Sequence, residues 1–412
     1  YSQSPTTGYI ILNDEYLFAG TSKTYNLYVW VDYGEDGVNN SQMNKTFEGI
    51  VAITDSVVYN RQGLYALLNQ QKANILTLPK LSTTIGSPII VLSKNQGIDV
   101  NNVTNIYSVD LHKARPDYQN TNMAFFADVD DEDVIATWTE GNNFFIGERN
   151  QVRPGPSMQS AFSTANFYYH ECNLVRVELF NFNTSKVTNM KNMFSYTGNN
   201  SNEFTLNLGK HFNTSNVTDM SYMFCATGNY SSSFTLDLGK HFNTSKATNM
   251  TLMFDGTGRH SSSFTLDLGF HFNTSKVTTM YRMFSNFCEK CQTLNLDLGL
   301  HFNTSRVSDM HAMFENAGNL ATNFTLNLNS FVINNSAVNI SNLGLNSGAS
   351  TIIIGGGWGN ANSTQLDNNF FLLKKPTLVY ANSTFHSYRI GNKTMWDRWK
   401  GTGNTTFILN LP

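Results

Sequence analysis

The sequence is poor in charged residues, in long apolar runs and in cysteine, and each shortage excludes a class of protein. Charged side chains make up 14% of the 412 residues, and 27 basic against 30 acidic groups leave a net charge of −3. This balance removes the electrostatic basis for binding nucleic acid or an anionic membrane. No run of about 18 apolar residues occurs, so no transmembrane helix is expected. Four cysteines are too few for a disulfide scaffold.

The polar surface of the chain must come mainly from uncharged side chains. Charged residues fall well below the roughly 25% usual in soluble domains, and Ser, Thr and above all Asn take their place. This composition is more typical of proteins outside cells than of cytosolic enzymes, so we expect an extracellular protein, at a cell surface or secreted. The first residue, Tyr1, suggests a processed or trimmed chain; removal of an export signal and a simple cut would look the same.

The residue patterns typical of enzymes are also missing from the sequence. A search for a nucleophile with its base, for paired acids outside the repeat, for a phosphate-binding glycine loop and for a zinc motif finds none that stands out. We therefore expect no catalytic residue, no cofactor and no bound metal. An enzyme acting on polysaccharide, with two acids in the N-terminal region, is the competing hypothesis.

Internal repetition is the strongest signal in the sequence. Five segments follow one another with a 30-residue period, and the string Phe-Asn-Thr-Ser occurs at the same phase of each. A small apolar residue, two methionines and a phenylalanine follow at fixed spacing. The first copy contains Phe182, Val187, Met190, Met193 and Phe194, and the later copies begin at Phe212, Phe242, Phe272 and Phe302.

Each repeat combines two apolar periodicities. The residues Val187, Met190 and Met193 have the spacing of one face of a helical turn or two. The run from Phe234 to Leu238 instead alternates with the period of two that is typical of a strand. The predicted unit is therefore strand, turn, short helix, turn. A single unit cannot bury enough apolar surface to offset the entropy lost on ordering, so the units must stack in register as a solenoid.

The repeat resembles that of a known group of proteins. Its first copy reads Phe-Asn-Thr-Ser-Lys-Val-Thr-Asn-Met-Lys-Asn-Met-Phe from Phe182 to Phe194, and Leu-Asp-Leu follows in later copies. From Leu174 to Leu328 the chain is similar to the BspA-like leucine-rich surface repeat of bacterial surface proteins and mycoplasma lipoproteins. The resemblance implies an extracellular, non-enzymatic protein used for adhesion or surface architecture. Asn stands where that family usually has Asp, and the unit is longer than usual, so the resemblance implies the fold and no particular ligand.

The patterns divide the chain into four segments. Residues 1–115 show β-rich runs separated by turns, which predict a small antiparallel β-sandwich with one helix near residues 62–73. Residues 116–173 are expected to cap the solenoid, residues 174–343 to form it, and residues 344–412 to close it as a β-rich cap. The expected fold class is β-rich with short helices: a leucine-rich-repeat-like solenoid of 30-residue coils between a β-sandwich-like domain and a β-rich cap.

Two columns of polar side chains should run along the stacked coils. The outward position at each strand end forms a stripe, which is either a simple solvated ladder or a ligand-binding surface. One histidine per coil forms the second column, and we favour packed rings over a metal site because no carboxylate or cysteine lies at ligand spacing. The stripe consists of Asn207, Asp237, Asp267, Asp297 and Asn327, and the histidines are His211, His241, His271 and His301.

The cysteines give one candidate crosslink. Cys288 and Cys291 replace the glycine-rich turn of the other coils. In an oxidising compartment we expect them to form a local disulfide, whereas in the cytosol they would be half of a redox or metal site. Cys172 and Cys225 fall about two coils apart, which is too far for them to pair with each other.

Two further motifs have alternative interpretations. The acidic cluster from Asp128 to Asp133 could hold Ca²⁺, but its spacing fits no calcium loop well and favours a turn. The start of each repeat is also an N-glycosylation sequon, which a sugar occupies if the source organism modifies asparagine. These sequon residues are Asn183, Asn213, Asn243, Asn273 and Asn303.

The sequence favours an extracellular, non-catalytic surface protein that acts in adhesion or interaction through a rigid repeat solenoid. The alternative is a structural subunit of a surface filament or coat, assembled through its terminal domains. The expected partner is a protein or glycan on a host or neighbouring cell surface, bound by many weak contacts along an extended face. In the alternative, the partners are copies of the chain itself.

Overall fold

The computed structural model describes most of the chain after residue 60. The described residues are 61–83, 88–112, 121–164, 173–334, 337–358, 377–381, 389–390, 393–394 and 405–409. The chain divides into two units, Tyr1–Asn60 and Arg61–Pro412, and everything below concerns the second. The first half of the expected β-sandwich therefore lies outside the described residues.

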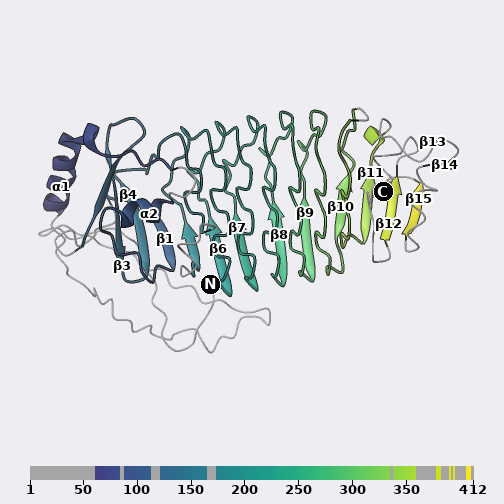
Figure 1. Ribbon diagram of the computed structural model, residues 1–412, viewed down its shortest axis with the longest axis horizontal. Coiled ribbons are helices and arrows are strands. Elements are labelled where there is room, and N and C mark those ends of the chain that lie inside the picture. The colour runs from purple at the N-terminus through teal and green to yellow at the C-terminus, as the bar shows by residue number, and fades with distance from the viewer. Residues whose placement is uncertain are drawn as a thin grey trace, which may run out of the picture. The chain divides into compact units, whose positions relative to one another are not determined.

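Most regular elements of the second unit are short β-strands, with a few short helices, most of them near its start (Figure 1). The helical elements are α1 (Arg61–Ala73), η2 (Ile75–Thr77), α2 (Ile89–Lys94) and η3 (Gly356–Trp358). The strands are β1 (Asn105–Asp110), β2 (Ala124–Ala127), β3 (Val134–Glu140), β4 (Asn143–Glu148), β5 (Arg176–Glu178), β6 (Glu203–Asn207), β7 (Ser233–Asp237), β8 (Ser263–Asp267), β9 (Thr293–Asp297), β10 (Thr325–Leu328), β11 (Thr351–Ile354), β12 (Thr377–Ala381), β13 (Arg389–Ile390), β14 (Lys393–Thr394) and β15 (Thr405–Leu409).

The repeats form a β-solenoid of about six coils of roughly 30 residues, as the sequence predicts. Strands one period apart pair in parallel, with Phe204 opposite Phe234 and Phe264 opposite Leu294. The methionines of neighbouring coils lie above one another: the Met190 N–H donates to the Asp219 carbonyl one coil on, and the Met220 N–H repeats the bond with Asn249. Both methionines are fully buried in one continuous core.

Stacked aromatic rings run through this core along the solenoid. Phe194, Phe224, Phe254, Phe284 and Phe314 form a column in which successive ring centroids lie 5.2–5.6 Å apart and are nearly parallel. Offset stacking of this kind contributes about 0.5–1.5 kcal/mol per pair beyond the area buried. The invariant closing phenylalanine of each repeat therefore couples every coil to the next.

The helical part of the predicted unit is wrong. The segment from Val187 to Phe194 forms a series of tight turns, in which the Met193 N–H donates to the Met190 carbonyl while the Phe194 N–H donates to Met223 in the next coil. Asn192 sits in the left-handed region with φ 57°, which ends any helix. Consecutive turns direct every third residue inward, so apolar residues have the same spacing in this spiral as on one face of a helix.

The Phe-Asn-Thr-Ser motif forms an inter-coil ladder. The Thr214 hydroxyl is fully buried; it donates to the Asn243 carbonyl at 2.8 Å and accepts the Asn243 N–H at 2.6 Å. The Asn243 side chain in turn accepts the N–H of Ser245, which closes a local turn. The same buried position is held by Thr184, Thr214, Thr244, Thr274 and Thr304.

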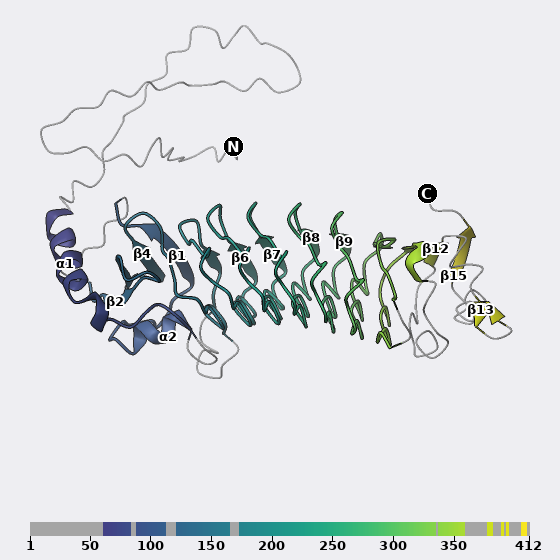
Figure 2. The ribbon, with the colours of Figure 1, turned by 90° about the horizontal axis from the view of Figure 1, so that it is seen from above.

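The N-terminal end of the solenoid carries a different arrangement. Strands β2, β3 and β4 are antiparallel and continue the solenoid sheet in the order β2-β3-β4-β1-β5-β6-β7. Leu64 and Leu68 of α1 pack in a separate cluster with Trp138 of β3. The described part of the expected sandwich, which includes β1, thus contributes a helix and a central strand to this end. Figure 2 shows α1 and α2 beside these strands, with β6 to β9 following in sequence.

The C-terminal end continues the parallel stacking. Strands β10, β11, β12 and β15 form one parallel sheet in that order. Trp358 is buried and stacks on Phe331 at 6.1 Å, which extends a column of phenylalanine rings. In the described part of the chain, no helix is both long and apolar enough to span a bilayer.

Candidate functional site

The predicted polar stripe has a structural role at the end of each strand. The Asp237 carboxylate accepts the N–H of Gly239 at 2.8 Å, and Asp267 accepts that of Gly269 at 2.8 Å. Such a bond between a side chain and the backbone two residues on fixes a turn and leaves the second carboxylate oxygen outside it. The same bond is made by Asn207, Asp237, Asp267, Asp297 and Asn327.

An exposed residue follows each turn glycine, and the equivalent residue of the first coil follows Leu179; its identity varies along the solenoid. We call this row the ridge; it consists of Phe180, Lys210, Lys240, Phe270 and Leu300. The Phe270 side chain is 71% exposed and that of Leu300 89%. Large apolar side chains this exposed contribute little to a fold, and neighbouring ones mark contact surfaces.

The histidine column lies beside the ridge. His211 is half-buried and contacts the Gln151 side-chain nitrogen through Nδ1 at 2.9 Å. Burial, followed by the nearby Lys210 charge, lowers the pKa of His211. The Phe270 ring stands edge-on to His271 and His301, at 5.4 and 5.1 Å. Within the described segments, no three His, Cys, Asp or Glu side chains gather in a way that could hold a metal ion.

Strand pairing is interrupted twice among the described strands of the solenoid, between β9 and β10 and between β7 and β8, and the groove described below lies at the boundary of β7 and β8. No strand pairing joins these two strands in the described chain, although β6 pairs with β7 along its whole length. A Cβ built on Gly239 would lie 2.5 Å from the Gly209 carbonyl, whereas one on Gly269 would meet nothing within 4 Å. The strands stay joined at their starts, where the Ser262 N–H donates to the Ser232 carbonyl at 3.1 Å. The opening is therefore a wedge at the strand ends.

This wedge forms an open groove of about 1000 Å³. Its floor includes the half-exposed Leu236 and the buried Leu238. Of the predicted stripe, Asn207, Asp237 and Asp267 line the groove, whereas Asp297 and Asn327 are not part of its lining. The ridge and histidine residues on its wall are Phe180, Lys210, Lys240, Phe270 and His271.

The ridge is not among the residues predicted from the sequence. Its signal is present in the repeat: between an invariant glycine and an invariant histidine, one position changes from Lys210 and Lys240 to Phe270 and Leu300. A repeat keeps the residues that stacking requires and is free to vary elsewhere. An exposed position that varies between cationic and large apolar side chains is therefore a candidate for contact.

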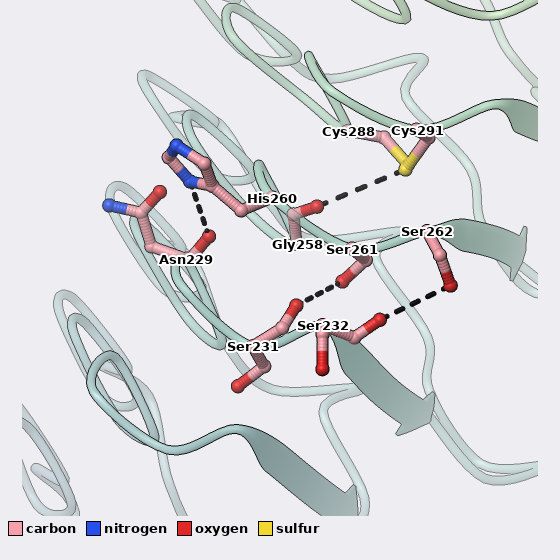
Figure 3. The surroundings of a disulfide bond; sticks show 9 residues. All are labelled: Asn229, Ser231, Ser232, Gly258, His260, Ser261, Ser262, Cys288 and Cys291. Carbon is pink, nitrogen blue, oxygen red and sulfur yellow. Dashed lines mark hydrogen bonds between the residues drawn. A yellow bond between two sulfur atoms is a disulfide. The ribbon is translucent and has the colours of Figure 1, made fainter.

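The structure joins Cys288 and Cys291 in a buried disulfide within a turn of the solenoid. Figure 3 shows this turn next to that of the preceding coil, where the Ser261 hydroxyl donates to the Ser231 carbonyl at 2.9 Å. Cys291 takes the place of that serine, and Cys288 takes the place of Gly258. Its φ of 48° lies in the left-handed region, as does the 56° of Gly258.

The coil that contains the disulfide differs from its neighbours at one more position. A Cβ on Gly228 would lie 2.7 Å from the Phe234 ring six residues on, so a cysteine there would clash. Six residues after Cys288 the chain has Leu294 instead of phenylalanine. Leu294 and the two cysteines therefore stand where the preceding coil has phenylalanine, glycine and serine.

The acidic cluster is neutralised by arginine side chains. Arg153 forms an ion pair with the buried carboxylate of Asp128 and also contacts the buried Glu148 side chain, and Arg149 pairs with Asp133 at 2.6 Å. Burial raises the pKa of Glu148 to about 8, against the opposing effect of Arg153. The cluster therefore acts as a structural ion-pair network beneath β4.

The sequon asparagines take part in the turns of the coils. The five sequon asparagines are half-buried, and each accepts the N–H of the serine two residues on. The motif has this structural role in every coil, and its glycosylation stays a prediction. Cys225 is a buried free thiol whose pKa burial raises to about 12, while Cys172 lies outside the described residues.

One family of known proteins is similar to the solenoid. The sequence profile of the family described as "Mycoplasma protein of unknown function, DUF285" matches residues 156–287 and 259–347. The two matches together contain all five Phe-Asn-Thr-Ser segments. Neither the curated proteins nor the solved structures give a match to this chain. The protein is thus a repeat solenoid whose coils are similar to a mycoplasma-type family of unknown function.

Proposed function

We propose that this chain is an extracellular, non-catalytic surface protein that adheres to host or neighbouring cells through its solenoid. Its repeat would then be of the BspA-like surface type. The observation that carries the proposal is the groove between β7 and β8, with exposed ridge residues on its wall. A concave site flanked by exposed aromatic side chains is the usual form of a binding surface.

Two further observations support this function. The disulfide between Cys288 and Cys291 suits an oxidising compartment, because thiols in the cytosol are kept reduced. The coils are coupled by continuous ladders and aromatic columns, which give a stiff scaffold for presenting a surface. The groove is lined by strand ends of that scaffold and by the turns that follow them.

The test is direct binding of the purified chain to intact cells. Fluorescently labelled protein should bind cells saturably, and unlabelled protein should compete for the same sites. Antibody labelling of intact source cells should also detect the chain at the surface. Non-saturable binding, or antibody labelling only after permeabilisation, would refute the proposal. Gel filtration of the same sample should give one monomeric species; filaments or sheets would favour a coat subunit.

A further inference from the structure

We propose that the groove between β7 and β8 binds a short neutral oligosaccharide, with one sugar ring stacked on Phe270. This inference rests on the proposed adhesive function and names the class of its ligand. Four properties of the groove lead to this class: its shape, its charge, the way its polar groups are held and its exposed rings.

The shape of the groove excludes an added peptide strand. Strand addition needs a free edge along several residues, but β7 and β8 are held together at their starts. There the Ser262 N–H bonds to Ser232 at 3.1 Å, and the Phe234 and Phe264 rings stack at 5.1 Å. Only the strand ends diverge. The volume of about 1000 Å³ is at the upper end of the range for small-ligand sites, so a compact ligand suits it.

The charges of the groove balance. Lys210 and Lys240 contribute two positive charges, and Asp237 and Asp267 contribute two negative charges. A ligand with a strong charge of either sign would meet repulsion from one pair as well as attraction to the other. A neutral ligand with many hydroxyl groups uses both pairs, because a hydroxyl donates to a carboxylate and accepts from an ammonium group.

The carboxylates are held in place before any ligand arrives. Asp237 and Asp267 each have one oxygen bonded to a turn N–H at 2.8 Å, which fixes the orientation of the other. Both side chains are exposed, so that second oxygen can reach a ligand hydroxyl. Acceptors that are already oriented lose little entropy on binding, and hydrogen bonds to charged groups are the stronger ones.

Aromatic side chains lie at both ends of the groove. Phe180 is 47% exposed and Phe270 71% exposed. His271 and His301 stand at 81° and 86° to the Phe270 ring, so neither ring stacks flat on it. The C–H face of a sugar ring is apolar and fits flat on an aromatic face, while its hydroxyls point to the rim. Phe270, Asp267 and Lys240 together present both kinds of contact.

The chain supplies matched variants for a test. Phe270→Ala removes the stacking ring from a side chain that is exposed, so the fold should be retained. Leu300→Ala removes a more exposed apolar side chain from the same row, one coil outside the groove. Asp267→Asn removes a charge and keeps the turn, because Asn207 and Asn327 make the same turn in this protein.

The experiment measures binding of the full chain to an array of neutral, sulfated and sialylated oligosaccharides. Isothermal titration calorimetry with the neutral oligosaccharide that binds best follows. We expect binding to neutral members, at least a tenfold loss in Phe270→Ala, a smaller loss in Asp267→Asn and no change in Leu300→Ala. Binding to no member of the panel, a preference for charged sugars, or equal losses of affinity in Phe270→Ala and Leu300→Ala would overturn the inference.

The same variants separate this inference from the proposed function. If wild-type protein and Phe270→Ala bind cells equally while the panel is blank, the saccharide site is wrong and adhesion stands. If the wild-type protein binds neither cells nor the panel, both proposals fail. Cell binding that is lost in Phe270→Ala and competed by the neutral oligosaccharide supports both.

Discussion

The threonine ladder gives the sharpest test of how the coils are held together. The Thr214 hydroxyl makes two hydrogen bonds to the backbone of Asn243 in the next coil, at 2.6 and 2.8 Å, and is fully buried. Thr214→Val keeps the shape of the side chain and removes only the hydroxyl. The variant therefore isolates the contribution of the hydrogen bonds.

The expected loss follows from the groups left without a partner. A hydrogen bond contributes a net of about 0.5–1.5 kcal/mol, and a buried polar group without its partner costs about 1–3 kcal/mol. Removing the hydroxyl affects both the N–H and the carbonyl of Asn243. We expect Thr214→Val to lower the free energy of unfolding by about 2–4 kcal/mol.

The matched control lies four residues away in the same coil. Thr218 is exposed, and its hydroxyl makes one long hydrogen bond of 3.3 Å to the Thr188 carbonyl. That carbonyl also accepts the Thr218 N–H at 2.9 Å, so it keeps a partner in Thr218→Val. We expect this variant to change the free energy of unfolding by less than about 0.5 kcal/mol.

The assay is urea unfolding followed by circular dichroism, with hydrogen exchange at the Asn243 amide as the local readout. Thr214→Val should unfold at lower urea and exchange that amide faster, whereas Thr218→Val should match the wild type in both. Equal midpoints for the two variants would refute the argument that the buried hydroxyl joins the coils.

Five more variants test three other parts of the account. Cys291→Ser should lower the free energy of unfolding by about 2 kcal/mol, measured by thermal unfolding, because a short crosslink is broken. The double variant Cys288→Gly/Cys291→Ser recreates the turn of the neighbouring coil and should match the wild type, even under reductant. An equal loss in both would contradict the role given to the left-handed φ of Cys288. In urea unfolding, Met250→Ala should lower the free energy of unfolding by about 2–5 kcal/mol and Met250→Leu by less than about 1.5 kcal/mol. Similar urea midpoints for the two variants would mean that this position is not in a packed interior. The folded-state pKa of Glu148 is about 8, above that of an unfolded glutamate, so the native state binds the extra proton. Wild-type thermal stability should therefore fall as pH rises from 5 to 8, while Glu148→Gln should show a flatter profile. Parallel profiles would show that Glu148 does not titrate in this range.

The solenoid could be predicted from sequence because its signal repeats. Met190 and its equivalents must be buried in every coil, so their identity persists at a fixed interval. The strand of each unit was also predictable, since Phe234 and Leu236 alternate with outward Thr235. The helix was not, because a spiral of three-residue turns places apolar side chains inward at the same spacing as a helical face. Only the left-handed φ of residues such as Asn192 separates the two.

The candidate site was only partly predictable. The sequence indicated Asp237 and Asp267 as outward residues, and the structure shows that both line the groove. It could not indicate where the sheet opens, because β7 and β8 have the same five residues and yet are not paired with each other. It also gave no weight to Phe270, whose departure from the repeat is visible in the sequence but whose exposure is known only from the structure. Stacking of the coils constrains which residues can occupy the interior, whereas the position of the groove depends on where neighbouring strands separate.

The central claim is that 30-residue units stack in register, one strand spacing per coil. The most direct test is a set of spin-label distances from Glu203 to Ser263, Thr293 and Asn323, which are exposed positions two, three and four coils apart. The account predicts that these distances grow by about 4.8 Å with each added coil. Distances that fail to increase steadily from coil to coil would contradict it.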